Sequence, residues 1–219
     1  MSIMSPHWAT VALLPMQRAG RSLRNLLPEG RPIPVDVWDR RHVWIVRLVW
    51  LHALGLLAAS LLKGEIHAES VIGALAVATL SMLAGATRIA RRIRACLATA
   101  GLLLSSAVLV HLSGGVIEMH FHFFVALAII AFYQDWTVYL LAIAFVLIEH
   151  GVTGVLYPTA VYNHRAAWES PWVWAGIHTV FVAAASFANL VGWRVNEKQA
   201  LHDALTRLPN RALFRDRSA

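Results

Sequence analysis

Six long apolar segments, separated by short polar ones, make up most of the chain. They lie at about 42–62, 68–86, 95–113, 116–133, 137–157 and 171–193. Each is close to the ~20 residues that an α-helix needs to cross the hydrocarbon core of a bilayer. The pattern therefore predicts an all-α polytopic membrane protein, a six-helix transmembrane bundle with short loops, over residues 42–193.

The polar segments on either side of this bundle suggest three further parts. Residues 1–41 are a basic leader, which we expect either to lie in the membrane interface as a helix or to be disordered. Residues 194–202 have few apolar positions and indicate a helix that leaves the membrane as a signalling linker. Residues 203–219 are a separate segment with a motif of their own.

Composition supports lipid as the solvent of the bundle. The chain is 58% hydrophobic and 14% charged, whereas soluble domains carry roughly 25% charged residues. It has one cysteine, which excludes a disulfide framework and a cysteine-rich metal site.

The net charge of +7 is concentrated on one side of the predicted bundle. Arginine and lysine gather before the first span, between the second and third, and after the sixth, and only Lys63 and Arg165 fall on the other side. Positive residues in short loops stay in the cytoplasm, so we expect both termini to be cytoplasmic. The same distribution favours membrane lipid over nucleic acid as a partner.

Histidines gather toward the outer end of the predicted bundle. At ~1.5 Å of rise per residue, His122, His150 and His178 lie roughly 10 Å below the outer ends of their spans. His111 and His120 are expected nearer the surface, and His52 somewhat deeper. Histidines from several spans therefore share one outer layer.

A polar layer of this kind needs a physical reason, because a charged group at the centre of a span costs ~2.5–3.5 kcal/mol. Imidazole is a good ligand for Cu, Fe and Zn. We therefore expect a transition metal or haem b at His122, His150 and His178, with Glu118 beside them. At least one of the three further candidates His52, His111 and His120 should join them. A carboxylate can bind the ion directly or orient a ligand ring; Glu118 suits both roles and Glu149 the second.

Two other interpretations of the histidines stay open. They can form a proton-responsive polar network, or they can act as structural hydrogen-bonding contacts between helices, worth ~0.6 kcal/mol each.

Side-chain direction also bears on the predicted site. Glu118 and His122 are four residues apart and share a helix face, whereas His120 points away from His122.

A motif at the end of the chain suggests the output. Residues 203–214 contain D-x-L-T-x-L-x-N-R-x-x-F, carried by Asp203, Leu205, Thr206, Leu208, Asn210, Arg211 and Phe214. The segment resembles the opening of the GGDEF domain, the diguanylate cyclase module, over about 15 residues. The resemblance implies cyclic-di-GMP synthesis by a homodimer. The family's catalytic loop has no counterpart in these 219 residues, so enzymatic activity is expected of a longer protein and stays uncertain for this chain.

The membrane part carries a second resemblance. The run from His111 to Phe124, followed by residues 133–136 and 149–151, is similar to a membrane input region found before GGDEF, EAL and chemoreceptor output modules. It implies a sensory module of the bacterial inner membrane. We expect the module to couple a small diffusible ligand, a redox change or a metal to a cytoplasmic cyclase.

Two rival functions remain at this stage. A membrane oxidoreductase or electron carrier would also use histidines to hold haem or metal. A purely structural anchor would place a cyclase at the membrane and leave the histidines scattered.

Overall fold

The computed structural model describes residues 27–62 and 68–200 and is all-helical over them. The elements are α2 (Val35–Leu62), α3 (Ala68–Gly85), α4 (Arg91–Leu112), α5 (Ile117–Ile130), η1 (Ala131–Tyr133), α6 (Trp136–Leu156), α7 (Pro158–Val161), α8 (Arg165–Glu169) and α9 (Pro171–Ala200). Most of the leader and the whole GGDEF-like segment, 203–219, lie outside the described residues.

The described helices agree with the prediction of a polytopic membrane protein. Five of them, α2, α3, α4, α6 and α9, are long and apolar enough to cross a membrane, while Ile117–Tyr133 is a shorter apolar helix. The shorter helix, which corresponds to the fourth predicted span, ends at Gln134, whose left-handed backbone (φ 50°) breaks it. Asp135 then begins α6 by accepting a hydrogen bond from the Thr137 amide at 2.8 Å.

Two element boundaries differ from the sequence prediction. The first span begins at Val35, seven residues before the expected 42, because its first two turns are polar and an apolar window does not include them. The connection at 157–170 was expected to be a loop, but it forms α7 and α8. Pro158 starts α7 at a position where a missing amide hydrogen costs nothing.

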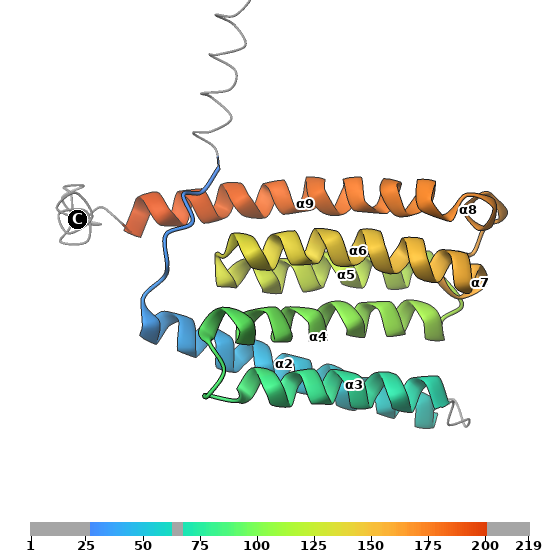
Figure 1. The fold of residues 1–219 in the computed structure, drawn as a ribbon, viewed down its shortest axis with the longest axis horizontal. Coiled ribbons are helices and arrows are strands. Elements are labelled where there is room, and N and C mark those ends of the chain that lie inside the picture. The colour runs from blue at the N-terminus through green and yellow to red at the C-terminus, as the bar shows by residue number, and fades with distance from the viewer. Residues whose placement is uncertain (1–26, 63–67, 201–219) are drawn as a thin grey trace, which may run out of the picture. The chain divides into compact units, whose positions relative to one another are not determined.

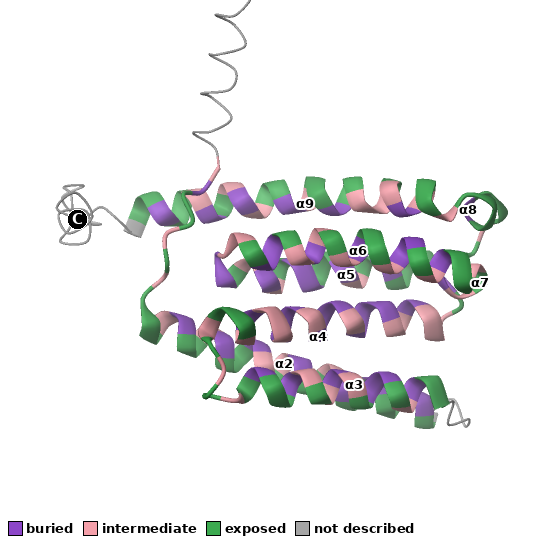
Figure 2. Cartoon of the chain, in the orientation of Figure 1, coloured by how far each residue is buried: buried purple, intermediate pink, exposed green. Residues whose placement is uncertain are grey.

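The chain forms two units, 32–187 and a smaller one whose described residues are 27–31 and 188–200. Within the first, α2 to α6 and the start of α9 run alongside one another (Figure 1). Helix α4 is central: it packs on α2, α3, α5 and α6, and Figure 2 shows mostly buried and half-buried residues along it. Small residues permit the close approach: a Cβ on Gly101 would lie 2.7 Å from Val49.

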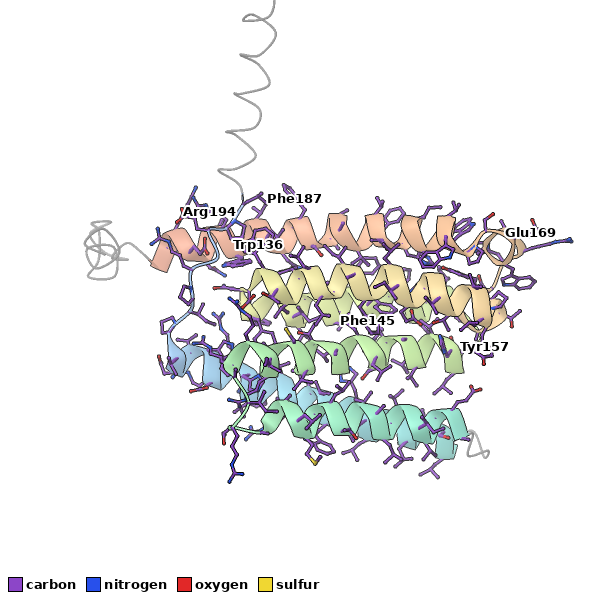
Figure 3. The ribbon with its side chains drawn as sticks, viewed as in Figure 1. Trp136, Phe145, Tyr157, Glu169, Phe187 and Arg194 are labelled. Atoms are coloured by element: carbon purple, nitrogen blue, oxygen red, sulfur yellow. The ribbon has the colours of Figure 1, made fainter. Side chains whose placement is uncertain are left out.

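The bundle has two distinct ends. Tyr157 and Glu169 lie at one end and Trp136 at the other (Figure 3). At the Trp136 end, Arg41 donates to the Phe132 carbonyl at 2.8 Å and Arg92 pairs with Asp135 at 3.3 Å. The Tyr157 end is closed by α7 and α8.

The turn between α4 and α5 packs against the backbone of α7. Gly115 has φ +75°, and a Cβ placed on it would lie 2.6 Å from the Tyr162 amide nitrogen. Gly114 has a similar φ of +72°, but nothing lies within 4 Å of its would-be Cβ. Gly115 is therefore required both by its left-handed backbone and by its close contact with α7, whereas Gly114 is required only by its backbone.

We predict that Gly115→Ala destabilises the protein more than Gly114→Ala. Both substitutions incur the ~1–3 kcal/mol of a left-handed non-glycine residue, but Gly115→Ala must also push α7 away. Reversible unfolding in detergent micelles measures the difference in unfolding free energy. Equal losses for the two variants would show that the contact with residues 161–162 is unimportant.

Candidate metal centre

Three histidines from three helices converge near the Tyr157 end of the bundle. His120 of α5, His150 of α6 and His178 of α9 each offer a ring nitrogen, and the three nitrogens lie within 4.8 Å of one another. Their ring centroids are 5.1–5.4 Å apart. We call these residues the histidine triad.

Aromatic side chains and a hydrogen bond hold the triad in place. Tyr162 stacks on the His178 ring at 5.7 Å and donates its hydroxyl to the His150 carbonyl at 3.2 Å. Phe123 meets the His150 ring edge-on at 5.2 Å. His120 and His150 are buried, with 7% and 1% of their surface exposed.

Each triad ring has a buried nitrogen without a hydrogen-bond partner among the described residues. These are Nε2 of His120 and Nδ1 of His150 and His178. The other nitrogen of His120, Nδ1, lies 3.1 Å from the Val116 carbonyl. A carbonyl only accepts, so His120 carries its proton on Nδ1 and presents a lone pair at Nε2. Because buried polar groups are normally paired, the nitrogens of His120 and His178 indicate a missing ligand, whereas Nδ1 of His150 has a Glu149 carboxylate oxygen 2.7 Å away.

The triad geometry fits one metal ion. Three nitrogens at ~2 Å from one ion stand about 3–3.5 Å apart, so each ring would move by on the order of 1 Å to bind it. Haem fits less well, because it accepts at most two protein ligands, on opposite faces of the porphyrin. A third imidazole this close to both would lie in the porphyrin plane.

Glu149 links the triad to a half-buried histidine nearer the end of the bundle. Its Oε2 lies 2.7 Å from His150 Nδ1, although the angle is not that of a hydrogen bond. Its Oε1 lies 3.2 Å from His111 Nε2 and accepts from the Thr153 hydroxyl at 3.3 Å. A carboxylate behind a ligating imidazole orients the ring and makes it more basic. Glu149 therefore lies where the orienting role predicted from the sequence would require it.

An apolar pocket of about 430 Å³ opens beside the triad. The three triad rings line it, and the other lining side chains are mostly aromatic and aliphatic residues of α5 and α9: Ile117, Phe121, Phe124, Trp174, Ile177 and Phe181. Several of these are exposed at the bundle surface. A ligand that dissolves in lipid can therefore reach the triad from the side.

The structure places the other sequence candidates differently from our expectation. It brings His120, not His122, together with His150 and His178. His122 instead contacts His52, with 3.0 Å between the two Nε2 atoms. Similar depth in the membrane does not by itself bring two histidines together, because the direction of each side chain decides which helix it faces. Residues two apart on a helix, such as His120 and His122, point to different sides.

The two acidic candidates also differ in their contacts. Glu118 is exposed in the first turn of α5 and makes no hydrogen bond or ion pair to any described residue. A carboxylate there is favourable simply because it faces the positive end of the helix dipole. Glu149, by contrast, is directly against the triad.

Sequence reasoning missed two buried aromatic groups. Tyr162 lies in the connection that was expected to be a loop, and nothing in the pattern placed it on His178. His42 is buried near the other end of the bundle, where Nδ1 lies 2.8 Å from the Tyr133 hydroxyl and Nε2 lies 2.9 Å from the Ala84 carbonyl. Its position at the start of an apolar segment was the one available signal.

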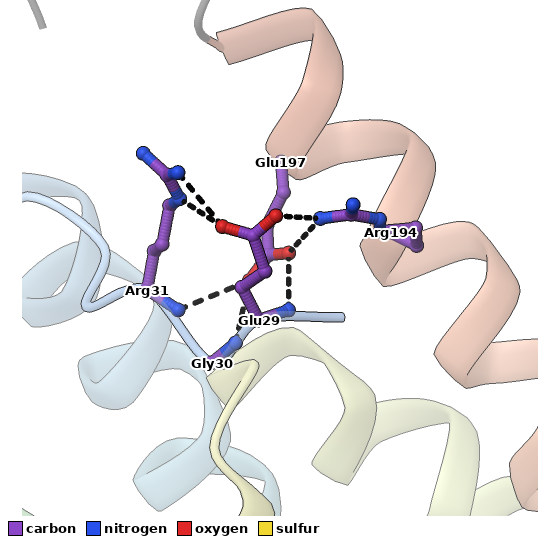
Figure 4. A network of polar contacts seen from close by, with 5 residues as sticks. All are labelled: Glu29, Gly30, Arg31, Arg194 and Glu197. Carbon is purple, nitrogen blue, oxygen red and sulfur yellow. Dashed lines mark hydrogen bonds and ion pairs between the residues drawn. The ribbon is translucent and has the colours of Figure 1, made fainter. Parts of the chain in front are cut away.

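The smaller unit contains a second polar site, shown in Figure 4. Oε2 of Glu197, near the end of α9, accepts from the Glu29 amide at 2.8 Å, and Oε1 accepts from those of Gly30 and Arg31 at 3.0 Å. Arg194 pairs with Glu29 at 2.8 Å. The Arg194 hydrogen bond, with that of Arg31, lowers the pKa of Glu29, so its carboxylate stays charged at neutral pH. We call this contact the Glu197 clamp.

The fold and the triad define a polytopic membrane protein with a buried three-imidazole site beside a lipid-accessible pocket. No protein-family model and no solved structure matches the chain. The chain is homologous to part of Transducer protein Htr8 from Halobacterium salinarum, with 40% identity over 186 residues. The match covers 78% of this chain and 28% of that protein, so the chain spans little more than a quarter of its relative. This membrane region is thus shared with a signal transducer.

We predict that Glu149→Gln weakens divalent metal binding about 10–100-fold, the range found when a group that orients a ligand is lost. The amide keeps the size of the side chain but loses the negative charge beside His150. Glu118→Gln is the matched control and should bind metal as the unaltered protein does. Competition titration of the detergent-purified protein measures both affinities. If the two variants are weakened alike, Glu149 has no special role.

Proposed function

We propose that the chain is the transmembrane sensory module of a signal transducer, and that its histidine triad binds one divalent transition-metal ion. The observation that carries this proposal is the meeting of three buried imidazole nitrogens within 4.8 Å in a region homologous to a transducer. The ion would be copper, iron or zinc, which imidazole binds well. The Glu149 carboxylate would offset part of its charge.

Helix α9 is the element that would carry the response. It supplies His178 near one end and continues to Ala200, where the Glu197 clamp lies. Only 17% of its most apolar window is buried, although Trp172 packs against Gly151 and Val182 belongs to the core of the bundle. A ligand shifts the position of α9 only if it binds two arrangements of the triad with different affinity.

The output of the full-length protein is the finer part of the proposal. The motif at 203–214 supports a diguanylate cyclase domain after α9, on the cytoplasmic side of a prokaryotic membrane. The stimulus would be a small molecule reaching the pocket beside the triad, a redox change of the ion, or the ion itself. An oxidoreductase holding haem b is less well supported, since three converging imidazoles suit a metal ion without a porphyrin.

We predict that both ends of the chain lie in the cytoplasm, because Arg40, Arg41 and Arg194 stand on the basic side of the bundle. Fusions of alkaline phosphatase, active only outside, and of green fluorescent protein, active inside, test this. Fusions after Gly85 and after Ala200 should give fluorescence, and those after Ser113 and Tyr162 should give phosphatase activity. Phosphatase activity after Ala200 would reverse the orientation and place the triad near the inner face.

We predict that His150→Ala and His178→Ala each lower divalent metal affinity at least ~10-fold and abolish the response of the full-length protein, while membrane insertion is unchanged. The experiment strips the protein of metal and adds back Cu²⁺, Fe²⁺ or Zn²⁺. Metal content and cyclic-di-GMP synthesis are then measured on the same preparation.

His164→Ala is the control for these variants. His164 lies in the same region, but its Nδ1 accepts from the Ala167 amide at 3.3 Å and it is outside the triad. This variant should bind metal and respond as the unaltered protein does. If His150→Ala and His178→Ala lose the metal and still respond, the triad is not the sensor.

A further inference from the structure

We propose that His52 and His122 form a second metal site, separate from the triad, that binds one Cu(I) ion between α2 and α5. The two Nε2 atoms face each other 3.0 Å apart, and the rings meet edge to face at 5.0 Å between centroids. Two imidazoles on opposite sides of one ion stand about 4 Å apart, twice a metal–nitrogen bond of ~2 Å. Opening the pair by on the order of 1 Å would admit the ion.

The outer nitrogen of each ring is already held in the way a ligating histidine requires. His52 Nδ1 lies 2.6 Å from the Leu48 carbonyl, and His122 Nδ1 lies 2.8 Å from the Ser106 hydroxyl. The carbonyl accepts only, so the His52 proton is on Nδ1 and its Nε2 is a lone pair. Metal-bound histidines almost always donate their second N–H in this manner.

Ser106 decides where the second lone pair lies. Its hydroxyl has one hydrogen, which can go to His122 Nδ1 or to the Leu102 carbonyl at 3.1 Å. In the first case His122 Nε2–H donates to His52 and the pair is neutral and closed. In the second case His122 donates to Ser106, and both Nε2 lone pairs face one another. Ion binding therefore moves the His122 proton from Nε2 to Nδ1, turns one hydroxyl, and releases no proton.

Charge favours a monovalent ion at this pair. Among residues 27–62 and 68–200, no carboxylate makes a hydrogen bond or ion pair to either ring. A divalent ion would leave two uncompensated charges in an apolar bundle, which is unfavourable. Cu(I) carries one charge and accepts two-coordinate nitrogen ligation, whereas Zn²⁺ requires about four ligands. The triad favours a divalent ion instead, because the Glu149 carboxylate lies against it and would offset part of the charge.

An entry path to the pair is present. A groove of about 300 Å³ has His52 in its wall, together with Leu51, Gly55, Leu56 and Leu109. Both rings are half-buried rather than sealed. The ion can therefore reach the pair without passing the triad.

The test is a competitive Cu(I) titration of the detergent-purified full chain, under anaerobic reducing conditions with a coloured Cu(I) chelator. The unaltered protein should bind one Cu(I) by two nitrogens in X-ray absorption. His52→Leu and His122→Leu should each weaken this binding at least ~100-fold, because one of two ligands is lost.

A serine pair provides the matched comparison if the leucine variants fold poorly. Ser105 and Ser106 are adjacent and buried, and each donates to the carbonyl four residues earlier. Only Ser106 contacts His122. Ser106→Ala should weaken Cu(I) binding ~10–100-fold, and Ser105→Ala should not change it. Equal affinities in the two serine variants, or Cu(I) binding retained without His52, would overturn the proposal.

The proposal for this site and the proposal for the triad can be tested independently. His178→Ala should lose the divalent ion and keep Cu(I), while His122→Leu should do the reverse. If His178→Ala instead removes Cu(I), the ion sits in the triad and the second site does not exist. If His178→Ala leaves divalent binding intact, the triad proposal fails and the Cu(I) site stands.

Discussion

Buried imidazoles inside an apolar bundle need partners, because the hydrocarbon around them supplies no water to hydrogen-bond with. Most histidines in the membrane helices described here have a specific neighbour that meets this need, wholly or in part. His42 is fully paired by a hydroxyl and a carbonyl. His52 and His122 pair with each other. Among the described histidines, His120 and His178 of the triad each keep a buried ring nitrogen without a hydrogen-bond partner, and both line the pocket.

The placement of carboxylates gives the two histidine groups different chemistry. Glu149 lies against His150 and reaches back to His111, so a divalent ion in the triad would be partly neutralised and its ligand ring oriented. The His52–His122 pair is supported by a carbonyl and a hydroxyl, which carry no charge. Two sites that share helix α5 would thus select ions of different charge.

In the proposed function, α9 carries the response from the triad to its far end. The helix joins the triad through His178, and 17% of its most apolar window is buried. Its far end is tied to residues 29–31 by the Glu197 carboxylate, which accepts three successive backbone amides. Gly30 has φ +79°, a conformation that aims consecutive amides at one anion. Changes at α9 therefore bear directly on the segment that precedes α2.

The sequence alone determined the class of protein, because apolar segments of membrane length and one-sided arginines follow from the physics of the bilayer. It also located the layer of histidines, and it assigned Glu149 a role in orienting a ligand. Only the tertiary structure decided which histidines meet. His120 and His122 are both in α5, and helical direction sends one to α6 and α9 and the other to α2. The first turns of α2 escaped prediction because they are polar. The short helices α7 and α8 escaped it because contacts such as Gly115 against Tyr162 position this connection, and not an apolar pattern.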